Sequence, residues 1–295
     1  MERLTDDQLW VWNRWPDLQK AFPDVTTNET SYNNYMLWWK VYFPMEMPAR
    51  MYTQPQTPEK DNILVIPGHK IRALVVTPTT DKYDQYWSEY WTALQNMDGN
   101  FDILIIDNSD NTDYFEELKK RIRPTNHITM VKHWYDQQFE NVGFWQSQEK
   151  LALIHNYARN LFLGSMYSHF LSIEADVAVE KYAFRKLLRI KLPVVQAPIV
   201  RGGQYLHGTF TNYPSVGNMS MHILSKHEVD SSQLIKVDWG SIGCCLIERW
   251  VMEQVAWRSN PNGDQHDDMW FAVDCKNYNI PIHLMPGVEV RHLKM

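Results

Sequence analysis

The sequence predicts an α/β fold, a mostly parallel sheet with helices on both faces. Apolar runs typical of buried strands, such as residues 71–78 and 101–107, alternate with stretches of helical composition. Parallel strands need crossover connections, usually helices that cover the sheet, so their strands are apolar on both sides. The 295 residues, 44% of them hydrophobic, suffice for one large α/β domain or two smaller ones.

The expected elements follow one another from residue 71 to residue 292. Strands are expected at residues 71–78, 101–107, 127–135, 169–176, 194–200 and 234–247, with a last strand ending near residue 292. Helices are expected around residues 86–94 and at residues 113–122, 146–163, 177–189, 248–257 and 267–277. Residues 201–217 are rich in turn-forming residues, which favours a loop that covers a substrate.

Residues 1–68 are predicted to form a helical N-terminal extension and connector, and residues 69–295 the main α/β domain. A capping box at residues 5–8 opens a short helix, and Ser31 caps a second one. Four prolines between positions 44 and 58 indicate an extended connector. Because the extension is rich in aromatic residues, we expect it to pack on the main body, line one side of a substrate site or make an oligomer contact.

Composition and charge argue against several classes of protein. The net charge of −6 does not suit a chain that binds nucleic acid over its whole surface. No run approaches the ~18 apolar residues of a membrane span, and the N-terminus does not resemble a signal peptide. The three cysteines have neither disulfide-framework nor zinc-site spacing. We therefore expect a cytoplasmic protein.

The segment from His169 to Asp176 is the most informative in the chain. Its apolar run ends in Glu174 and Asp176, and residues two apart in a strand point to the same side. Open α/β sheets bind ligands at the carboxyl ends of their strands. Oxygen-rich sites there suit Mg²⁺ or Mn²⁺, shared with substrate phosphates. The alternative is a solvated turn in which Asp176 caps the next helix.

Three further segments place polar groups at expected strand or helix ends. Residues 77–80 follow the first strand, residues 107–110 follow the second, and Asp267 and Asp268 open a helix before His292 ends the last strand. Three of these groups also have a purely structural interpretation: Asp107 as a turn-forming residue, Asp267 and Asp268 as acids that cap a helix, and His292 as a surface histidine.

In order and spacing these motifs resemble the GT-A glycosyltransferases, especially the family-two-like group of nucleotide-sugar enzymes with a Rossmann-like sheet. The resemblance spans residues 70–293 and consists of residues 104–113, 158–160, 172–176, 266–271 and 286–292. Glu174 stands where Asp is commoner in the D-x-D motif of these enzymes, and Asp267 stands where Glu is commoner. Both substitutions keep the negative charge.

The resemblance implies a role for each residue. Asp176 and His292 would bind Mn²⁺ or Mg²⁺, with Glu174 near the ion or the sugar–ribose moiety. Asp268 would be the catalytic base, with Asp267 second in order. The donor site would comprise Thr77, Pro78, Thr79, Asp107, Asn108, Arg159, Glu174 and Ala175. Within it, Asp107 would accept from a uracil N–H or a ribose hydroxyl, and Arg159 would reach the phosphates or the Asp107 turn.

The expected function is metal-dependent transfer of a hexosyl or pentosyl group from a nucleotide diphosphate donor, with a UDP-sugar favoured. The acceptor is a glycan or small molecule, or alternatively DNA with a hydroxymethylated base that is extruded from the duplex. The basic run at residues 181–191 and the N-terminal tryptophans are compatible with DNA, whereas the overall acidity is not.

Two other classes remain as alternatives. A nucleotidyltransferase also joins a nucleotide site to carboxylates, but residues 77–80 lack the glycines and lysine of its usual phosphate loop. The chain could also be a non-catalytic module that binds nucleotide sugars. In that case, neutralising Asp268 would leave every measurable activity unchanged.

Overall fold

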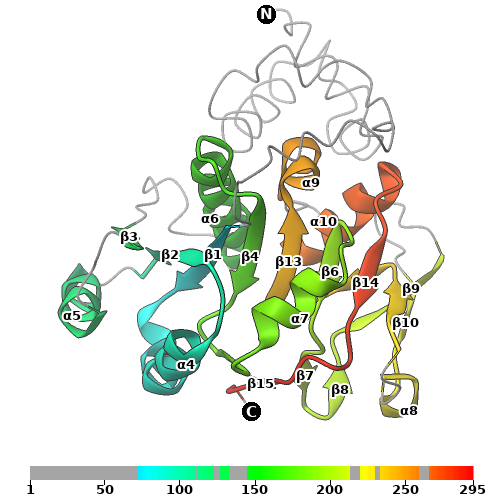
Figure 1. Ribbon diagram of the computed structural model, residues 1–295, viewed down its shortest axis with the longest axis horizontal. Coiled ribbons are helices and arrows are strands. Elements are labelled where there is room, and N and C mark those ends of the chain that lie inside the picture. The colour runs from blue at the N-terminus through cyan, green and yellow to red at the C-terminus, as the bar shows by residue number, and fades with distance from the viewer. Residues whose placement is uncertain are drawn as a thin grey trace, which may run out of the picture. The chain divides into compact units, whose positions relative to one another are not determined.

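The computed structural model describes residues 72–109, 112–122, 127–132, 145–212, 220–229, 233–258 and 266–294. Within them, eight strands form one sheet (Figure 1). From one edge to the other they are β11 (Ile235–Val237), β14 (Ile282–Leu284), β6 (Val194–Gln196), β13 (Cys244–Glu248), β4 (His169–Ile173), β1 (Ala73–Thr79), β2 (Phe101–Asp107) and β3 (Ile128–Lys132). The elements expected in residues 1–68 lie outside the described residues.

Six of the eight strands are parallel to one another, namely β3, β2, β1, β4, β6 and β14. The strand β13 lies antiparallel between β4 and β6, and β11 is antiparallel to β14. The expected α/β class with a mostly parallel sheet is therefore confirmed. The strand expected at residues 234–247 is divided into β11, β12 (Trp239–Gly240) and β13, because the chain turns at residues 242–243 to enter the sheet from its carboxyl edge.

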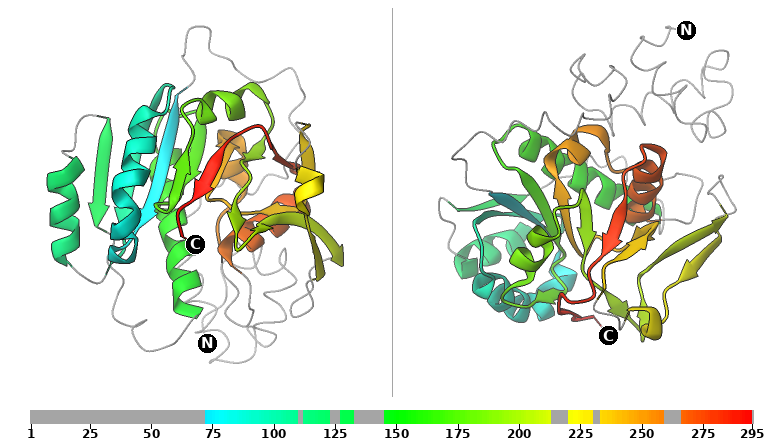
Figure 2. Two further views of the ribbon diagram at one scale, coloured as in Figure 1. Left: turned by 90° about the horizontal axis from the view of Figure 1, so that it is seen from below. Right: turned by 45° about the vertical axis from the view of Figure 1, so that its right-hand side comes forward.

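Helices cover both faces of the sheet (Figures 1 and 2). The helices α4 (Asp84–Asn96), α5 (Thr112–Ile122) and α7 (Ala183–Arg189) contribute buried residues to the core of one face. The other face carries α6 (Trp145–Leu163), α9 (Arg249–Gln254) and α10 (Asp267–Asn277). All the described helices are too short or too polar to span a membrane.

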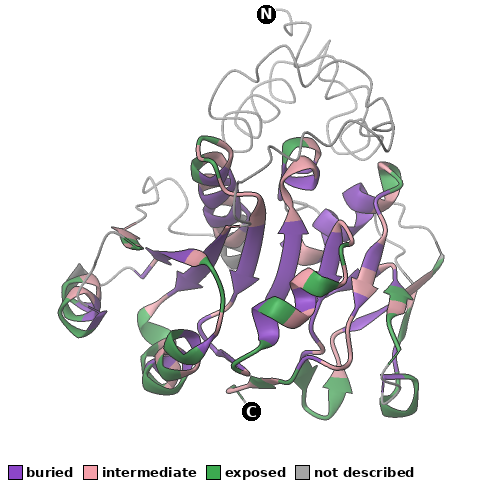
Figure 3. Ribbon diagram, viewed as in Figure 1, coloured by how far each residue is buried: buried purple, intermediate pink, exposed green. Residues whose placement is uncertain are grey.

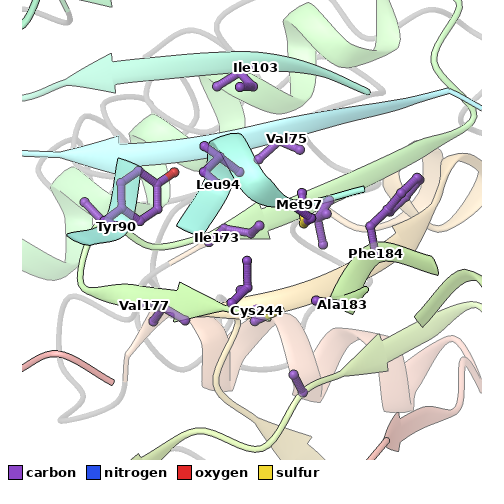
Figure 4. Close-up of a cluster of buried hydrophobic side chains, with 14 of the residues drawn as sticks. Val75, Tyr90, Leu94, Met97, Ile103, Ile173, Val177, Ala183, Phe184 and Cys244 are labelled. Carbon is purple, nitrogen blue, oxygen red and sulfur yellow. The ribbon is translucent and has the colours of Figure 1, made fainter. Parts of the chain in front are cut away.

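Alternate residues of the central strands face the two layers, so both sides of the sheet are buried (Figure 3). Val75 on β1 and Ile173 on β4 lie in the core between the sheet and the helices α4 and α7. Leu94 of α4 and Phe184 of α7 belong to the same core (Figure 4). On the opposite face, Phe170 on β4 packs edge to face against Phe162 of α6, with ring centroids 5.6 Å apart. Each such side chain contributes roughly 1.5–3 kcal/mol to stability.

The chain after Asp176 differs from the helix expected over residues 177–189. The strand β5 (Val177–Val179) forms first and pairs antiparallel with β15 (Val290–His292), and α7 begins only at Ala183. Two of the three residues of β5 are valines, which favour extended backbone over helix. The β5–β15 ribbon brings the end of the chain back to the carboxyl edge of β4.

The turn-rich region at residues 201–217 is more regular than expected. Gly202 and Gly203, with φ of 56° and 80°, form the two-residue turn between β7 (Val200–Arg201) and β8 (Gln204–Tyr205). The strands β9 (His207–Asn212), β10 (Ser220–Ile223) and β12 form a second sheet, followed by α8 (Lys226–Val229). This sheet lies at the end of the main sheet opposite α5 (Figure 2). Residues 213–219 and the loop at 260–264 lie outside the described residues.

Candidate functional site

Asp176 and His292 lie side by side at the carboxyl end of β4. His292 is the pairing partner of Val177, and the Leu293 N–H donates to the Asp176 carbonyl at 2.7 Å. His292 Nε2 is 3.4 Å from Asp176 Oδ2, and the two side chains are 8% and 5% exposed. Asp176 Oδ1 and His292 Nδ1 are buried without a hydrogen-bond partner in the structure. Buried polar atoms usually have partners, so this pair is a candidate ligand site.

Glu174 reaches the same place by a route that differs from the one expected. The strand β4 ends at Ile173, and the Glu174 carbonyl accepts from the Val177 N–H at 3.0 Å, which closes a turn. The Glu174 N–H donates to the Gly243 carbonyl at 3.1 Å. Asp176 therefore lies on a turn and not on the strand. The two carboxylates converge because the turn bends the chain, and not because of strand alternation.

The third acidic segment begins α10. Asp267 is buried, and its Oδ2 lies 2.6 Å from His155 Nδ1 on α6. Asp268 is only half-buried. His266 precedes the helix and makes no capping hydrogen bond through its side chain. Of the two acids, Asp268 is thus the one whose carboxylate is more open to a substrate.

The electrostatics of the site show that these acids share one region. Burial raises the pKa of Glu174 well above its usual range, and the negative charges of Asp176, Asp268 and Asp267 raise it further. Burial and the charge of Asp267 raise the pKa of Asp268 to about 6. Carboxylates held this close repel one another when ionised, so the site favours a bound cation or bound protons.

Two residues that the sequence motifs do not include also face this region. Tyr83, in the short helix η2 (Asp81–Tyr83), has its pKa raised by burial and by the charges of Asp176 and Glu174. Lys294 lowers the pKa of Glu174 through its positive charge, and its Nζ lies 5.9 Å from the centroid of the Tyr83 ring. Lys294 is therefore a cation at the edge of the acidic cluster.

The metal-ligand set expected from the sequence is only partly assembled. Asp176 and His292 meet, but Glu174 does not join them as a third ligand. Within the described ranges, no three His, Cys, Asp or Glu side chains are grouped closely enough to hold a metal ion. Substrate oxygens and water can complete the coordination of such an ion, which is the common arrangement for Mg²⁺.

Asp107 lies at the same edge of the sheet, two strands from β4, and is fully buried. Its Oδ1 accepts from the Ser109 N–H at 2.9 Å and from the Ser109 hydroxyl at 2.7 Å. Its Oδ2 accepts from Lys132 Nζ at 2.8 Å, and Lys132 also binds the Ser109 carbonyl. The expected contact with a uracil or ribose is not available to so enclosed a carboxylate. Asp107 instead fixes the shape of the turn that Asn108 and Ser109 form.

The other expected donor residues on β1 and after β4 are also buried. Thr77 and Thr79 are fully buried, with their hydroxyls hydrogen-bonded to Tyr90 and Tyr114. Pro78 and Ala175 are buried too. Any role of residues 77–79 in donor binding therefore falls to their backbone.

Arg159 is at the wrong edge of the sheet for the role expected of it. It is buried in the last part of α6, which precedes the amino end of β4, and its Nε donates to the Met252 carbonyl of α9 at 2.6 Å. Burial lowers the pKa of Arg159 to about 10. A helix that leads into a parallel strand ends at the amino edge of the sheet, so Arg159 is directed away from the Asp107 turn and the acidic cluster.

Replacing Lys132 with methionine should destabilise the Asp107 turn. Lys132 and Asp107 are 8% and 0% exposed, and removing one partner of a buried ion pair costs about 3–5 kcal/mol. The midpoint of urea unfolding measures the loss. Lys119→Met is the matched control, because Lys119 pairs with Glu116 on the exposed side of α5 and such pairs contribute about 0–1 kcal/mol. Equal midpoints for the two variants would contradict the structural role of Lys132.

No family model and no curated protein matches this sequence. Among solved structures, A197 from STIV aligns over 75% of this chain and 85% of its own, with 12% identity and a TM-score of 0.42. TarS 1–349 from S. aureus in complex with UDP aligns over 73% of this chain, with 12% identity and a TM-score of 0.45. This chain spans 58% of TarS 1–349 and 35% of a second, longer TarS chain.

Proposed function

We propose that this chain is a metal-dependent glycosyltransferase that moves a sugar from a nucleotide diphosphate donor, with a UDP-sugar favoured, to an acceptor hydroxyl. The observation that carries the proposal is the meeting of Asp176 and His292, both buried and each with an unpartnered atom, beside Glu174 and Asp268. This group lies outside the carboxyl ends of the parallel strands, where open α/β sheets bind their ligands.

Asp176 and His292 are the residues that would hold Mn²⁺ or Mg²⁺. Two protein ligands with oxygens of a diphosphate suit Mg²⁺, and the imidazole makes Mn²⁺ equally acceptable. When bound, the ion offsets the negative charge that gathers on the diphosphate leaving group. The partners missing around Asp176 Oδ1 and His292 Nδ1 fit a site completed by a ligand.

Asp268 takes the proton of the acceptor hydroxyl as that oxygen attacks the anomeric carbon. A general base works best when its pKa lies near the working pH. Burial and the neighbouring Asp267 bring the pKa of Asp268 to about 6, so it is mostly ionised at neutral pH and still basic enough to accept a proton. The backbone of residues 77–79 and the turn at residues 107–109 border the nucleotide.

The acceptor that we favour is a glycan or a small hydroxyl compound. The alternative, DNA, depends on the basic run at residues 181–191, where Arg185 pairs with Asp98 and Lys186 pairs with Glu180. Two of the five cations of that run are thus partly neutralised within the domain, which weakens the case for a phosphate-binding surface.

The proposal is tested by thermal unfolding with UDP, ADP, GDP and CDP in the presence of Mn²⁺, and again in EDTA. We expect UDP with Mn²⁺ to stabilise the protein by about 2.7 kcal/mol at a ligand concentration of 100 times Kd, and the effect to disappear in EDTA. If none of the four nucleotides stabilised the protein in the presence of Mn²⁺, the proposal would be contradicted.

The products separate the proposed function from its alternatives. A glycosyltransferase releases UDP from a UDP-sugar, whereas a nucleotidyltransferase releases pyrophosphate from a nucleoside triphosphate. A binding module would be stabilised by UDP and release neither product.

A further inference from the structure

We infer that His155 is a positioning residue which, through Asp267, fixes the first turn of α10 and holds Asp268 in place for its role as the base. This inference rests on the proposed function, because it assigns Asp268 a role in sugar transfer. It also reassigns Asp267, the second candidate for the base, to a supporting role.

The contact between the two residues is short and enclosed. His155 Nδ1 lies 2.6 Å from Asp267 Oδ2, and the side chains are 1% and 5% exposed. We assign the proton of this bond to Nδ1, which then donates to the carboxylate oxygen. His155 Nε2 is buried without a partner in the structure, so the contact with Asp267 is the hydrogen bond that orients the ring.

His155 is itself held by rigid neighbours. Its ring lies 5.1 Å from the ring of Trp257, and Trp257 stacks on Phe271 of α10 at 5.0 Å. The adjacent Asn156 binds the Trp257 backbone twice, with its amide donating to the carbonyl at 2.6 Å and its oxygen accepting from the N–H at 3.0 Å. These contacts lock α6, the chain around Trp257 and α10 into one frame.

The tie to His155 acts at the very start of α10, because Asp267 is the first residue of the helix. Successive helical residues are about 100° apart around the axis, so fixing Asp267 on the α6 side sets the direction of Asp268. A base displaced by about 1 Å can lose 10²-fold in rate.

Asp267 is also a poor candidate for the base itself. It is 3% exposed, and its Oδ2 is occupied by His155. An acceptor hydroxyl must come within hydrogen-bond distance of the base, which the half-buried Asp268 allows and the enclosed Asp267 does not.

The first test compares kcat and KM for UDP release from UDP-glucose and UDP-N-acetylglucosamine, with water as the acceptor. Asp267→Ala should lower kcat by about 10–100-fold with little change in KM, because the base is displaced and the donor site is not. Asp267→Asn should lose less than about tenfold, because its amide oxygen still accepts from Nδ1–H. Asp268→Asn should lose about 10²–10⁴-fold. If Asp267→Asn lost as much as Asp268→Asn, Asp267 would be the base and the inference would be overturned.

The second test does not depend on turnover. The enclosed Nδ1–H of His155 should give a strongly downfield imidazole proton resonance in NMR spectra of the full chain. The resonance should persist in Asp268→Asn and be absent from Asp267→Ala and His155→Phe. His169→Phe is the matched control, because His169 is half-buried at the amino end of β4, and it should keep both the resonance and kcat.

The outcomes separate this inference from the proposed function. A wild-type spectrum without the resonance would overturn the pairing, even if UDP release is normal. A resonance with no UDP release from either UDP-sugar would overturn the proposed function and reduce the pair to a structural contact. If His155→Phe does not fold, Asp267→Asn still decides whether Asp267 positions α10 or acts as the base. Asparagine keeps the shape of the aspartate side chain and an oxygen that accepts from His155 Nδ1–H.

Discussion

Replacing Asp176 with alanine is expected to lower the rate of sugar transfer by about 10²–10³-fold and to leave the fold intact. The Asp176 side chain contacts His292 at 3.4 Å, and its second oxygen has no partner in the structure, so few contacts are lost. Its removal also relieves repulsion with Glu174, whose pKa it raises. The donor diphosphate, however, loses a residue that would hold its cation, and losing electrostatic stabilisation of this kind costs about 10²–10³-fold in kcat. UDP release and Mn²⁺-dependent thermal stabilisation by UDP measure the effect.

Two variants complete this experiment. His292→Ala should behave like Asp176→Ala, because its imidazole occupies the other side of the same contact. Asp98→Ala is the matched control, since Asp98 is an acid that pairs with Arg185 at the surface, on the α7 side of the domain. Wild-type turnover of the Asp176→Ala variant in EDTA would contradict the assignment of a metal site.

The sequence predicts much of the sheet because its strands are long apolar runs between helical stretches. β2 forms over the residues expected, and β1 begins and ends within two residues of the expected bounds. The order of the motifs also places Asp176 and His292 at one edge. The pairing that joins them, β5 with β15, is not evident from three-residue strands, since short extended segments become strands only when a distant partner is present.

The residues that the sequence analysis misses are those whose partners are remote. His155 and Asp267 are 112 positions apart, and a lone histidine on a helix has no feature that distinguishes a positioning role from a core position. Lys132 ends an edge strand, where lysine is common for other reasons. Arg159 shows the opposite case. The family resemblance assigns it a contact with the phosphates or the Asp107 turn, but α6 directs it to the other edge of the sheet, where its Nε donates to the Met252 carbonyl.

Replacing Asp268 with asparagine should lower turnover and raise stability at the same time. The pKa of Asp268 is raised from 3.8 to about 6 by burial and by Asp267, so the native state keeps a proton that the unfolded chain has lost between these pH values. Stability therefore falls as the pH rises from 3.8 to about 6, and the loss remains at higher pH. Asparagine carries no charge and avoids this cost, which is on the order of 1–3 kcal/mol at neutral pH.

The same change removes the group that accepts the proton of the acceptor, so kcat should fall by about 10²–10⁴-fold. The wild-type rate should rise with pH through about 6 as Asp268 ionises, and the variant should lose this limb of the profile. Asp238→Asn is the control, because Asp238 pairs with Lys276 at 3.0 Å and its neutralisation should weaken the fold while the pH profile stays unchanged. If Asp268 served packing alone, replacing it with asparagine would not raise stability while lowering kcat. A fall in both stability and kcat for Asp268→Asn would therefore place the base elsewhere.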